Sequence, residues 1–247
     1  MPVVFVHGVP ETAAIWSELI AALSRTDVIT LSPPGFGAPV PSGFQPTSDG
    51  YRDWLIGELE AIGQPVDLVG HDWGGGHVLR VVMERPDLIR SWVSDIAGAM
   101  DPDYEWHELA RTWQTPFIGE STLAMAVAAP TSMRVQQFQS LGMGSASEAV
   151  AAGMNADMTR CILALYRSAK QPAMRTWGAS LENASARPGL VIAAEKDSYV
   201  GGSALAKKSA DRCGARFVEL KGRGHWWMCE DPAEGARMLH EFFASLG

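Results

Sequence analysis

One short stretch of the 247-residue sequence combines the residue types that nucleophilic chemistry needs. A largely apolar run ends at Gly70, the turn His71-Asp72-Trp73-Gly74 follows, and apolar residues then recur at helical spacing over 77–83. A strand, a sharp turn and a helix, with small residues on both sides of a nucleophile, form the pattern of a nucleophile elbow. The alternative interpretation is a glycine-rich turn in which Asp72 only caps the helix.

The aspartate at the tip of this turn selects a particular chemistry. A serine in that position would attack a carbonyl carbon and become acylated. A carboxylate is a weaker nucleophile, suited to displacing a leaving group from saturated carbon, and the resulting ester of Asp72 is then open to cleavage by water. The sequence therefore predicts hydrolysis of a carbon–halogen bond or of a strained carbon–oxygen bond.

Such a nucleophile needs a base to activate water and an acid to orient the base. Asp197 follows the apolar run 189–194, and His225 follows the run 215–220, so the order is nucleophile, acid, histidine. Each of the three comes just after the carboxyl end of a predicted strand. Glu195 and Asp101 are rival candidates for the acid.

The elements that must position these residues alternate between strand and helix. Strands are predicted at 3–6, 27–31, 66–70, 91–97, 189–194 and 215–220, with amphipathic helices between them, the last over about 233–246. This alternation predicts an α/β fold with a doubly wound, mostly parallel sheet. Residues 101–186 show helical segments and no clear strand. We expect them to be an inserted helical cap over a core made of 1–100 and 187–247, roofing the edge of the sheet where such folds bind ligands.

Composition limits the alternatives further. The net charge of −8 argues against a polyanionic partner such as nucleic acid. The three cysteines have no metal-ligand spacing and are interpreted as reduced thiols of a cytoplasmic protein. No apolar run reaches membrane-spanning length, and the first residues lack the basic start of a signal peptide.

Several motifs resemble those of the α/β-hydrolase superfamily, in its soluble epoxide hydrolase and haloalkane dehalogenase branch. They are His7-Gly8-Val9-Pro10-Glu11, Gly70-His71-Asp72-Trp73-Gly74-Gly75, Ala194-Glu195-Lys196-Asp197 and Gly224-His225-Trp226. The resemblance spans the whole core and implies an oxyanion hole built from the backbone N–H groups of Val9 and Trp73. Members usually begin with an antiparallel hairpin that does not precede the first strand here. We therefore expect a shortened N-terminus and a sheet of about six strands.

The cap is less similar. Leu163-Ala164-Leu165-Tyr166-Arg167-Ser168 resembles the family motif whose tyrosine hydrogen-bonds an epoxide oxygen. The second tyrosine usual in this family is absent near Leu109–Gln114, and Tyr104 lies a few residues too early to replace it. The predicted substrate-binding residues are Trp73, Trp113, Gln114 and Phe117.

The resemblance implies an enzyme that opens epoxides to vicinal diols, with Asp72 as nucleophile, Tyr166 as donor, and His225 with Asp197 activating water. It implies no metal or organic cofactor. A haloalkane or haloacid dehalogenase is the alternative, because the Trp73 indole N–H beside the nucleophile could hold a halide, with Trp113 or Gln114 as a second donor. A non-catalytic binding protein is the third possibility. The expected partner is a small apolar substrate, with no nucleic acid or membrane, and the expected assembly is a monomer or homodimer.

Overall fold

The computed structural model describes all of residues 1–247 and contains one six-stranded sheet. Every neighbouring pair of strands is parallel, in the order β2-β1-β3-β4-β5-β6. The strands are β1 (Val3–Val6), β2 (Val28–Leu31), β3 (Val66–Gly70), β4 (Ile89–Ser94), β5 (Gly189–Ala194) and β6 (Arg216–Leu220). The predicted number of strands and the parallel sheet are confirmed.

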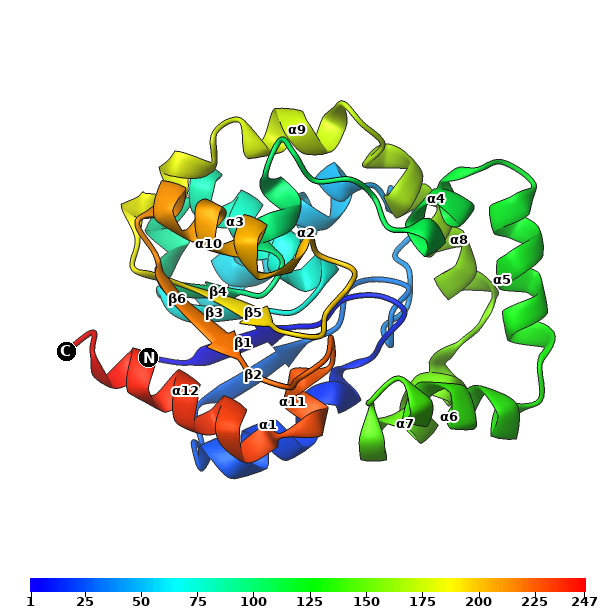
Figure 1. Ribbon diagram of the computed structural model, residues 1–247, viewed down its shortest axis with the longest axis horizontal. Helices are drawn as coiled ribbons and strands as arrows, with labels where there is room; N and C mark the ends of the chain where they lie inside the picture. Colours follow the sequence, from blue (N-terminus) through cyan, green and yellow to red (C-terminus); the bar gives the residue numbers. More distant parts are fainter.

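Helices cover both faces of the sheet, as Figure 1 shows. One face carries the short N-terminal helix and the C-terminal pair, and the other carries three helices. This is the doubly wound arrangement expected from the alternating pattern. The first set is α1 (Ser17–Leu23), α11 (Trp227–Glu230) and α12 (Pro232–Ala244); the second is α2 (Ser48–Ile62), α3 (Trp73–Glu84) and α10 (Gly202–Cys213). Short 3₁₀ helices supplement them: η1 (Ala13–Trp16), η2 (Pro86–Leu88) and η3 (Ala97–Met100).

The central strands are buried on both faces because helices cover both. All residues of β1, β3 and β5 are buried. These strands therefore consist mainly of apolar residues without polar alternation, as is usual for parallel strands. The predicted strand at 91–97 is shifted: β4 begins at Ile89 and ends at Ser94, and the chain turns into η3 three residues later.

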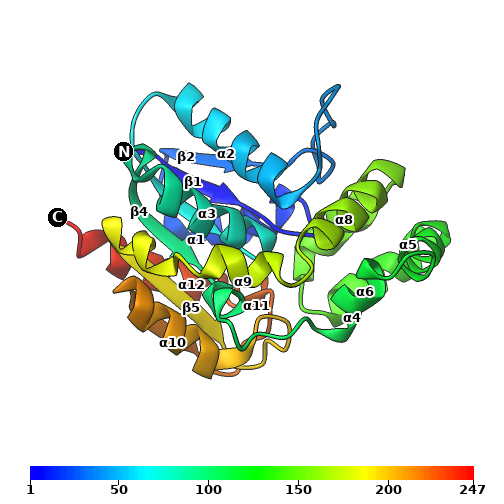
Figure 2. The ribbon, with the colours of Figure 1, turned by 90° about the horizontal axis from the view of Figure 1, so that it is seen from above.

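The chain between β4 and β5 forms no strand and adds six helices, in agreement with the sequence pattern. They are α4 (Glu108–Gln114), α5 (Ile118–Ala128), α6 (Thr131–Ser140), α7 (Ser147–Gly153), α8 (Ala156–Ser168) and α9 (Ala173–Gly178), with η4 (Gly144–Ala146) and η5 (Leu181–Ala186). Figures 1 and 2 show α4 to α8 beyond the carboxyl ends of the strands. The helix α9 returns to the core and packs on η3, and η5 packs on α3 and α10.

None of the helices is both long enough and apolar enough to cross a lipid bilayer.

Candidate active site

The turn between β3 and α3 holds Asp72 in a strained conformation. Asp72 has φ of 50° and ψ of −129°, a backbone conformation that residues with a side chain rarely adopt. The glycines on either side allow the chain to pass close to itself: a Cβ atom on Gly70 would lie 2.6 Å from the Gly74 backbone, and one on Gly74 would lie 2.2 Å from the Val6 carbonyl oxygen. The strain and the close approach place the Asp72 side chain at the tip of the turn, as the elbow pattern predicts.

The structure brings the other two sequence-predicted residues to Asp72. The loop after β5 supplies Asp197 and the loop after β6 supplies His225. The Nδ1 atom of His225 lies 2.6 Å from Asp197 Oδ2, and its Nε2 atom lies 3.7 Å from Asp72 Oδ2. The rival acids lie elsewhere, because Asp101 pairs with Lys208 and the exposed Glu195 accepts from the Gly222 N–H.

The two oxygens of the Asp72 carboxylate have different surroundings. Oδ1 accepts a hydrogen bond of 2.9 Å from the Val9 N–H, whereas Oδ2 faces His225. The carboxylate fits there because residue 8 is glycine; a Cβ atom on Gly8 would lie 2.3 Å from Oδ1. Trp73, the other expected backbone donor, begins α3 next to Asp72, but its N–H is not bonded to this carboxylate. Oδ2 is therefore the oxygen with freedom to react.

A buried network that the sequence reasoning missed lies beneath this site. His71 is fully buried, with Nδ1 2.5 Å from Asp95 Oδ2 and Nε2 3.0 Å from Glu11 Oε1. Glu11 also accepts from the Trp226 indole, and Asp95 accepts from the Asp72 N–H at 3.0 Å. The His71 and His225 rings lie 4.5 Å apart, centroid to centroid. The network thus fixes both the backbone of Asp72 and the loop that carries His225.

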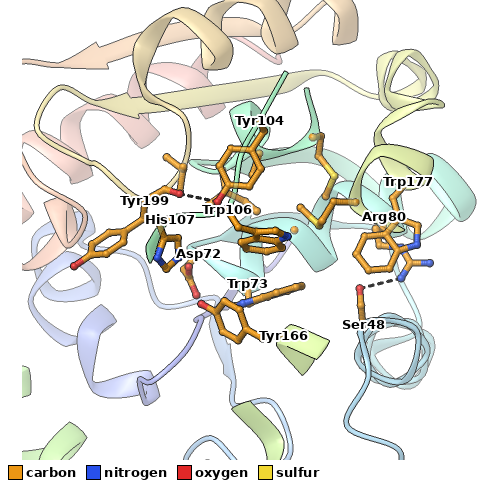
Figure 3. Close-up of a pocket in the computed structure, with 16 residues that line it drawn as sticks. Ser48, Asp72, Trp73, Arg80, Tyr104, Trp106, His107, Tyr166, Trp177 and Tyr199 are labelled. Atoms are coloured by element: carbon orange, nitrogen blue, oxygen red, sulfur yellow. Dashed lines mark hydrogen bonds between the residues drawn. The ribbon is translucent and has the colours of Figure 1, made fainter. Parts of the chain in front are cut away.

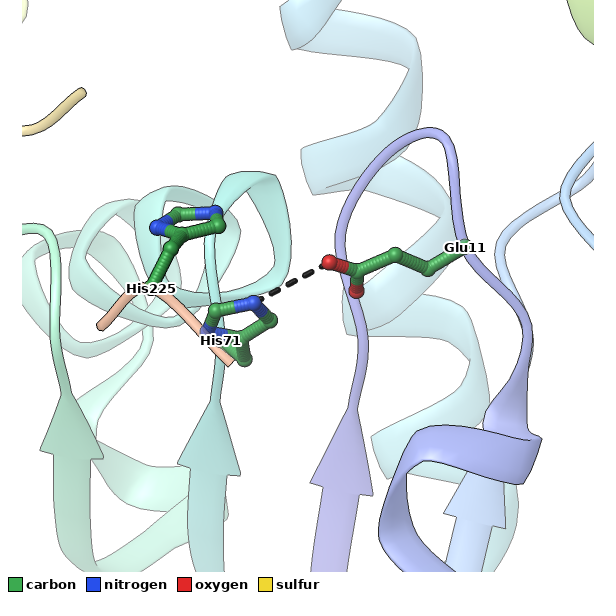
Figure 4. A group of neighbouring side chains, drawn as sticks. All are labelled: Glu11, His71 and His225. Atoms are coloured by element: carbon green, nitrogen blue, oxygen red, sulfur yellow. Dashed lines mark hydrogen bonds and ion pairs between the residues drawn. The ribbon is translucent and has the colours of Figure 1, made fainter. Parts of the chain in front are cut away.

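Glu11, His71 and His225 also have the residue types and spacing of a metal site, as Figure 4 shows. The chemistry of the donors argues for an ion-pair network instead. Burial alone would lower the pKa of His71, but the carboxylates of Asp95 and Glu11 raise it well above its usual value. Burial would raise the pKa of Glu11, yet His71 lowers it to about 2. A protonated imidazole has no lone pair for a metal ion.

The pKa values of Asp72, His225 and Asp197 are all shifted from their usual values. Burial raises the pKa of Asp72 to about 6, although the nearby His225 acts in the opposite direction. Burial would lower the pKa of His225, but Asp197 outweighs it, and the net direction is upward. The pKa of Asp197 is lowered, because His225 outweighs its burial. A carboxyl group with a raised pKa, beside a histidine that is paired with a second acid, is the kind of perturbation found at active sites.

Two cavities meet at Asp72. The smaller, of about 440 Å³, extends between Trp106 and Met100 toward Arg80, and the larger, of about 880 Å³, extends under α5 and α6. Four residues border both cavities, and we refer to them as the junction: Asp72, His107, Tyr166 and Tyr199. Figure 3 shows the Tyr166 hydroxyl beside the Asp72 carboxylate, while the Tyr199 hydroxyl points away from it.

The side chains predicted as proton donors or substrate contacts differ in which cavity they border. Tyr166 lies at the junction, and burial raises the pKa of its phenol well above the usual value, so it keeps its proton. The Trp73 and Trp113 rings stand edge-on to the Tyr166 ring, at centroid distances of 5.3 and 4.9 Å. Trp113 borders the larger cavity and Trp73 the smaller. The Tyr104 hydroxyl donates to the Tyr199 carbonyl at 2.8 Å.

Two of the predicted substrate contacts border neither cavity. Gln114 borders neither cavity; it lies behind Tyr166 and its amide donates to the Tyr166 carbonyl oxygen at 3.1 Å. Phe117 is 87% exposed and borders neither cavity; it precedes α5 and has a positive φ of 67°. The sequence Thr115-Pro116-Phe117 gave no sign of that backbone conformation.

Comparison with known proteins agrees with this architecture. Residues 3–238 match the family described as "Alpha/beta hydrolase family". An epoxide hydrolase from Caballeronia sordidicola is 32% identical over 95 residues, which is 36% of this chain and 29% of that protein. Among solved structures, a candidate epoxide hydrolase from Pseudomonas aeruginosa superposes with a TM-score of 0.80 at 17% identity, covering 99% of this chain and 88% of that one. The haloalkane dehalogenase DbeA from Bradyrhizobium elkani gives 0.76 at 18% identity, covering 99% and 90%.

The chain therefore belongs to the α/β-hydrolase family. Its relatives include members of the epoxide hydrolase and dehalogenase branch, which is the branch that its motifs resemble. The curated relative is matched over less than a third of its length, and the solved structures share the fold.

Proposed function

We propose that this enzyme hydrolyses epoxides to vicinal diols through a covalent ester of Asp72. The observation that carries this proposal is the Tyr166 hydroxyl at the same junction as the Asp72 carboxylate, which pairs a nucleophile for saturated carbon with a proton donor. In this proposal, residues 101–186 act as a cap over a core made of 1–100 and 187–247. The Caballeronia sordidicola epoxide hydrolase is a relative whose activity supports this assignment.

In the first step, Asp72 Oδ2 attacks one oxirane carbon and the strained C–O bond breaks. The electron pair goes to the leaving oxygen, which takes the proton of the Tyr166 hydroxyl. An alkoxide is strongly basic, so this step needs a proton donor. The Trp73 ring stands edge-on to the Tyr166 ring, and its indole N–H can only donate, so it does not compete with the substrate for the phenolic proton.

In the second step, water attacks the Asp72 ester carbon. His225 takes a proton from this water through Nε2, since Asp197 holds Nδ1 in its protonated form. The Val9 N–H, already bonded to Oδ1, and the Trp73 N–H stabilise the oxyanion that forms there. When this intermediate breaks down, the leaving diol oxygen takes the proton of the hydroxyl group that water added, and Asp72 is restored as a carboxylate. The proton on His225 returns to Tyr166, so the net reaction is epoxide plus water to diol.

Haloalkane dehalogenation is the second candidate, favoured by the Trp73 indole beside the nucleophile. A leaving halide needs hydrogen-bond donors to stabilise it, but it does not need to receive a proton. In the structure the Gln114 amide donates to the Tyr166 carbonyl oxygen, so one of the three expected halide donors has another partner. This pairing favours the epoxide.

The test is to trap the ester. His225→Gln should form the covalent adduct but not release it, and incubation with styrene oxide should increase the protein mass by one substrate molecule. Asp72→Ala/His225→Gln should show no increase and serves as the control. An adduct with 1-bromobutane but none with styrene oxide would assign the dehalogenase instead. The absence of both adducts would favour a binding protein on this scaffold.

A further inference from the structure

In the resembled family, two side-chain donors usually hold the oxygen that leaves the epoxide carbon. In this chain only one tyrosine of the junction, Tyr166, has its hydroxyl directed to Asp72. The other nearby donors are occupied or shielded. The Tyr104 hydroxyl donates to the Tyr199 carbonyl. The Trp113 indole nitrogen has no partner, but it is buried and has no surface open to the cavity. A second donor must therefore come from one of the other residues of the junction.

We propose that His107 is a second catalytic donor, which holds the leaving oxygen together with Tyr166. This inference rests on the proposed epoxide hydrolysis. His107 precedes α4 and borders both cavities, as do Asp72 and Tyr166. Figure 3 shows its imidazole next to the Asp72 carboxylate, on the side opposite the labelled Tyr166 ring. The His107 and Tyr166 rings stand nearly perpendicular, with centroids 6.4 Å apart.

The hydrogen bonding of His107 fixes which nitrogen carries the proton. The Nδ1 atom accepts a hydrogen bond of 3.2 Å from the Ala110 N–H, so it caps α4 and must be unprotonated. The proton of the neutral ring is therefore on Nε2, which has no partner within the protein. The helix cap thus makes Nε2 of this pocket-lining residue a permanent donor.

The charge state of the His107 ring fits a group that donates a hydrogen bond without giving up its proton. Burial, and to a lesser degree the proximity of His225, lower the pKa of His107 to about 4. The imidazole is then neutral at neutral pH and stabilises the leaving oxygen by a hydrogen bond without transferring a proton. Tyr166 supplies the proton, so the balance of the reaction described above is unchanged.

Two substitutions separate the donor from the cap. In His107→Asn, the side-chain oxygen can take the place of Nδ1 and cap α4, but no N–H reaches the place of Nε2. In His107→Gln, the amide nitrogen can reach the place of Nε2, but the cap is lost. We expect His107→Asn to keep the melting temperature and to slow ester formation on the order of 10²-fold. We expect His107→Gln to melt earlier and to retain most of the rate.

Ester formation from styrene oxide would be followed in a single turnover, by rapid quenching and mass measurement, and ester breakdown would be followed separately. Breakdown should be unchanged in both variants, since His225, Asp197 and Val9 serve that step. Normal ester formation in His107→Asn would overturn the inference and leave the proposed function intact. Slow formation confined to His107→Gln would assign His107 to the cap alone. Wild-type enzyme that forms no ester with styrene oxide would overturn both proposals.

Discussion

The Nε2 atom of His225 lies 3.7 Å from Asp72 Oδ2, too far for a hydrogen bond and too close for a water molecule directly between them. A water molecule placed to one side can still contact both groups. The geometry therefore fits attack on the ester carbon of Asp72 from the side of His225, after Oδ2 has bonded to the substrate. It also means that Asp72 is free to react before His225 is needed.

The first prediction concerns Asp197. In Asp197→Asn, the amide would favour the His225 tautomer with the proton on Nε2, which cannot accept one from water. We expect ester breakdown to slow by roughly 10²- to 10⁴-fold, with ester formation nearly unchanged, so that the alkylated enzyme accumulates. Mass spectrometry during turnover would detect it. Asp101→Asn is the matched control, since Asp101 pairs with Lys208 and should not alter either step.

The second prediction concerns stability. Burial raises the pKa of Asp72 to about 6, above its value in the unfolded chain. The folded protein thus loses stability as pH rises from about 4 to 6 and Asp72 becomes charged. Asp72→Asn lacks this cost, so it should be more stable than wild type by about 1–3 kcal/mol at pH 7.5. Urea unfolding at several pH values should show the difference disappear below pH about 4; a difference independent of pH would contradict it.

The third prediction concerns Tyr166. Tyr166→Phe removes the proton donor, so diol formation from styrene oxide should fall on the order of 10²-fold or more. Any release of bromide from a bromoalkane should fall far less, because a halide needs no proton. Tyr199→Phe is the control, because Tyr199 belongs to the same junction but its hydroxyl points away from Asp72. Unchanged diol formation in Tyr166→Phe would argue for the dehalogenase.

The fourth prediction concerns the buried network. The Glu11 carboxylate accepts from the Gly8 N–H, the Trp226 indole and His71. Glu11→Gln would set an amide N–H against these donors and leave the His71 charge partly unpaired. We expect a loss of roughly 3–5 kcal/mol in the free energy of unfolding, measured in urea. Glu195→Gln at the surface should cost less than about 1 kcal/mol.

The sequence predicted the parts of this molecule that depend on local pattern. The runs at 3–6 and 189–194 match β1 and β5 residue for residue, because buried parallel strands leave a continuous apolar signal. The order of Asp72, Asp197 and His225 sufficed to place them together, since parallel strands end at one edge of the sheet.

The missed features depend on contacts across long stretches of chain. His71 joins Glu11 and Asp95, which are 60 and 24 residues away from it, and no periodicity marks such a pairing. The proposed role of His107 depends on its hydrogen bond from the Ala110 N–H and on a cavity lined by residues from distant parts of the chain. The sequence pattern around residue 107 does not reveal that cavity. Phe117 has a positive φ angle and an exposed ring, and nothing in the local sequence pattern predicts either feature.

The unequal cavities on the two sides of Asp72 have a stereochemical consequence. An epoxide with one small and one bulky substituent would fit in a single orientation, with the bulky group in the cavity of about 880 Å³. Oδ2 would then reach the same oxirane carbon in nearly every turnover. Hydrolysis in ¹⁸O-labelled water should therefore place the label, over repeated turnovers, on one carbon of the diol. Because both substrate enantiomers would be attacked at the same carbon, a racemic substrate hydrolysed to completion should yield equal amounts of the two diol enantiomers.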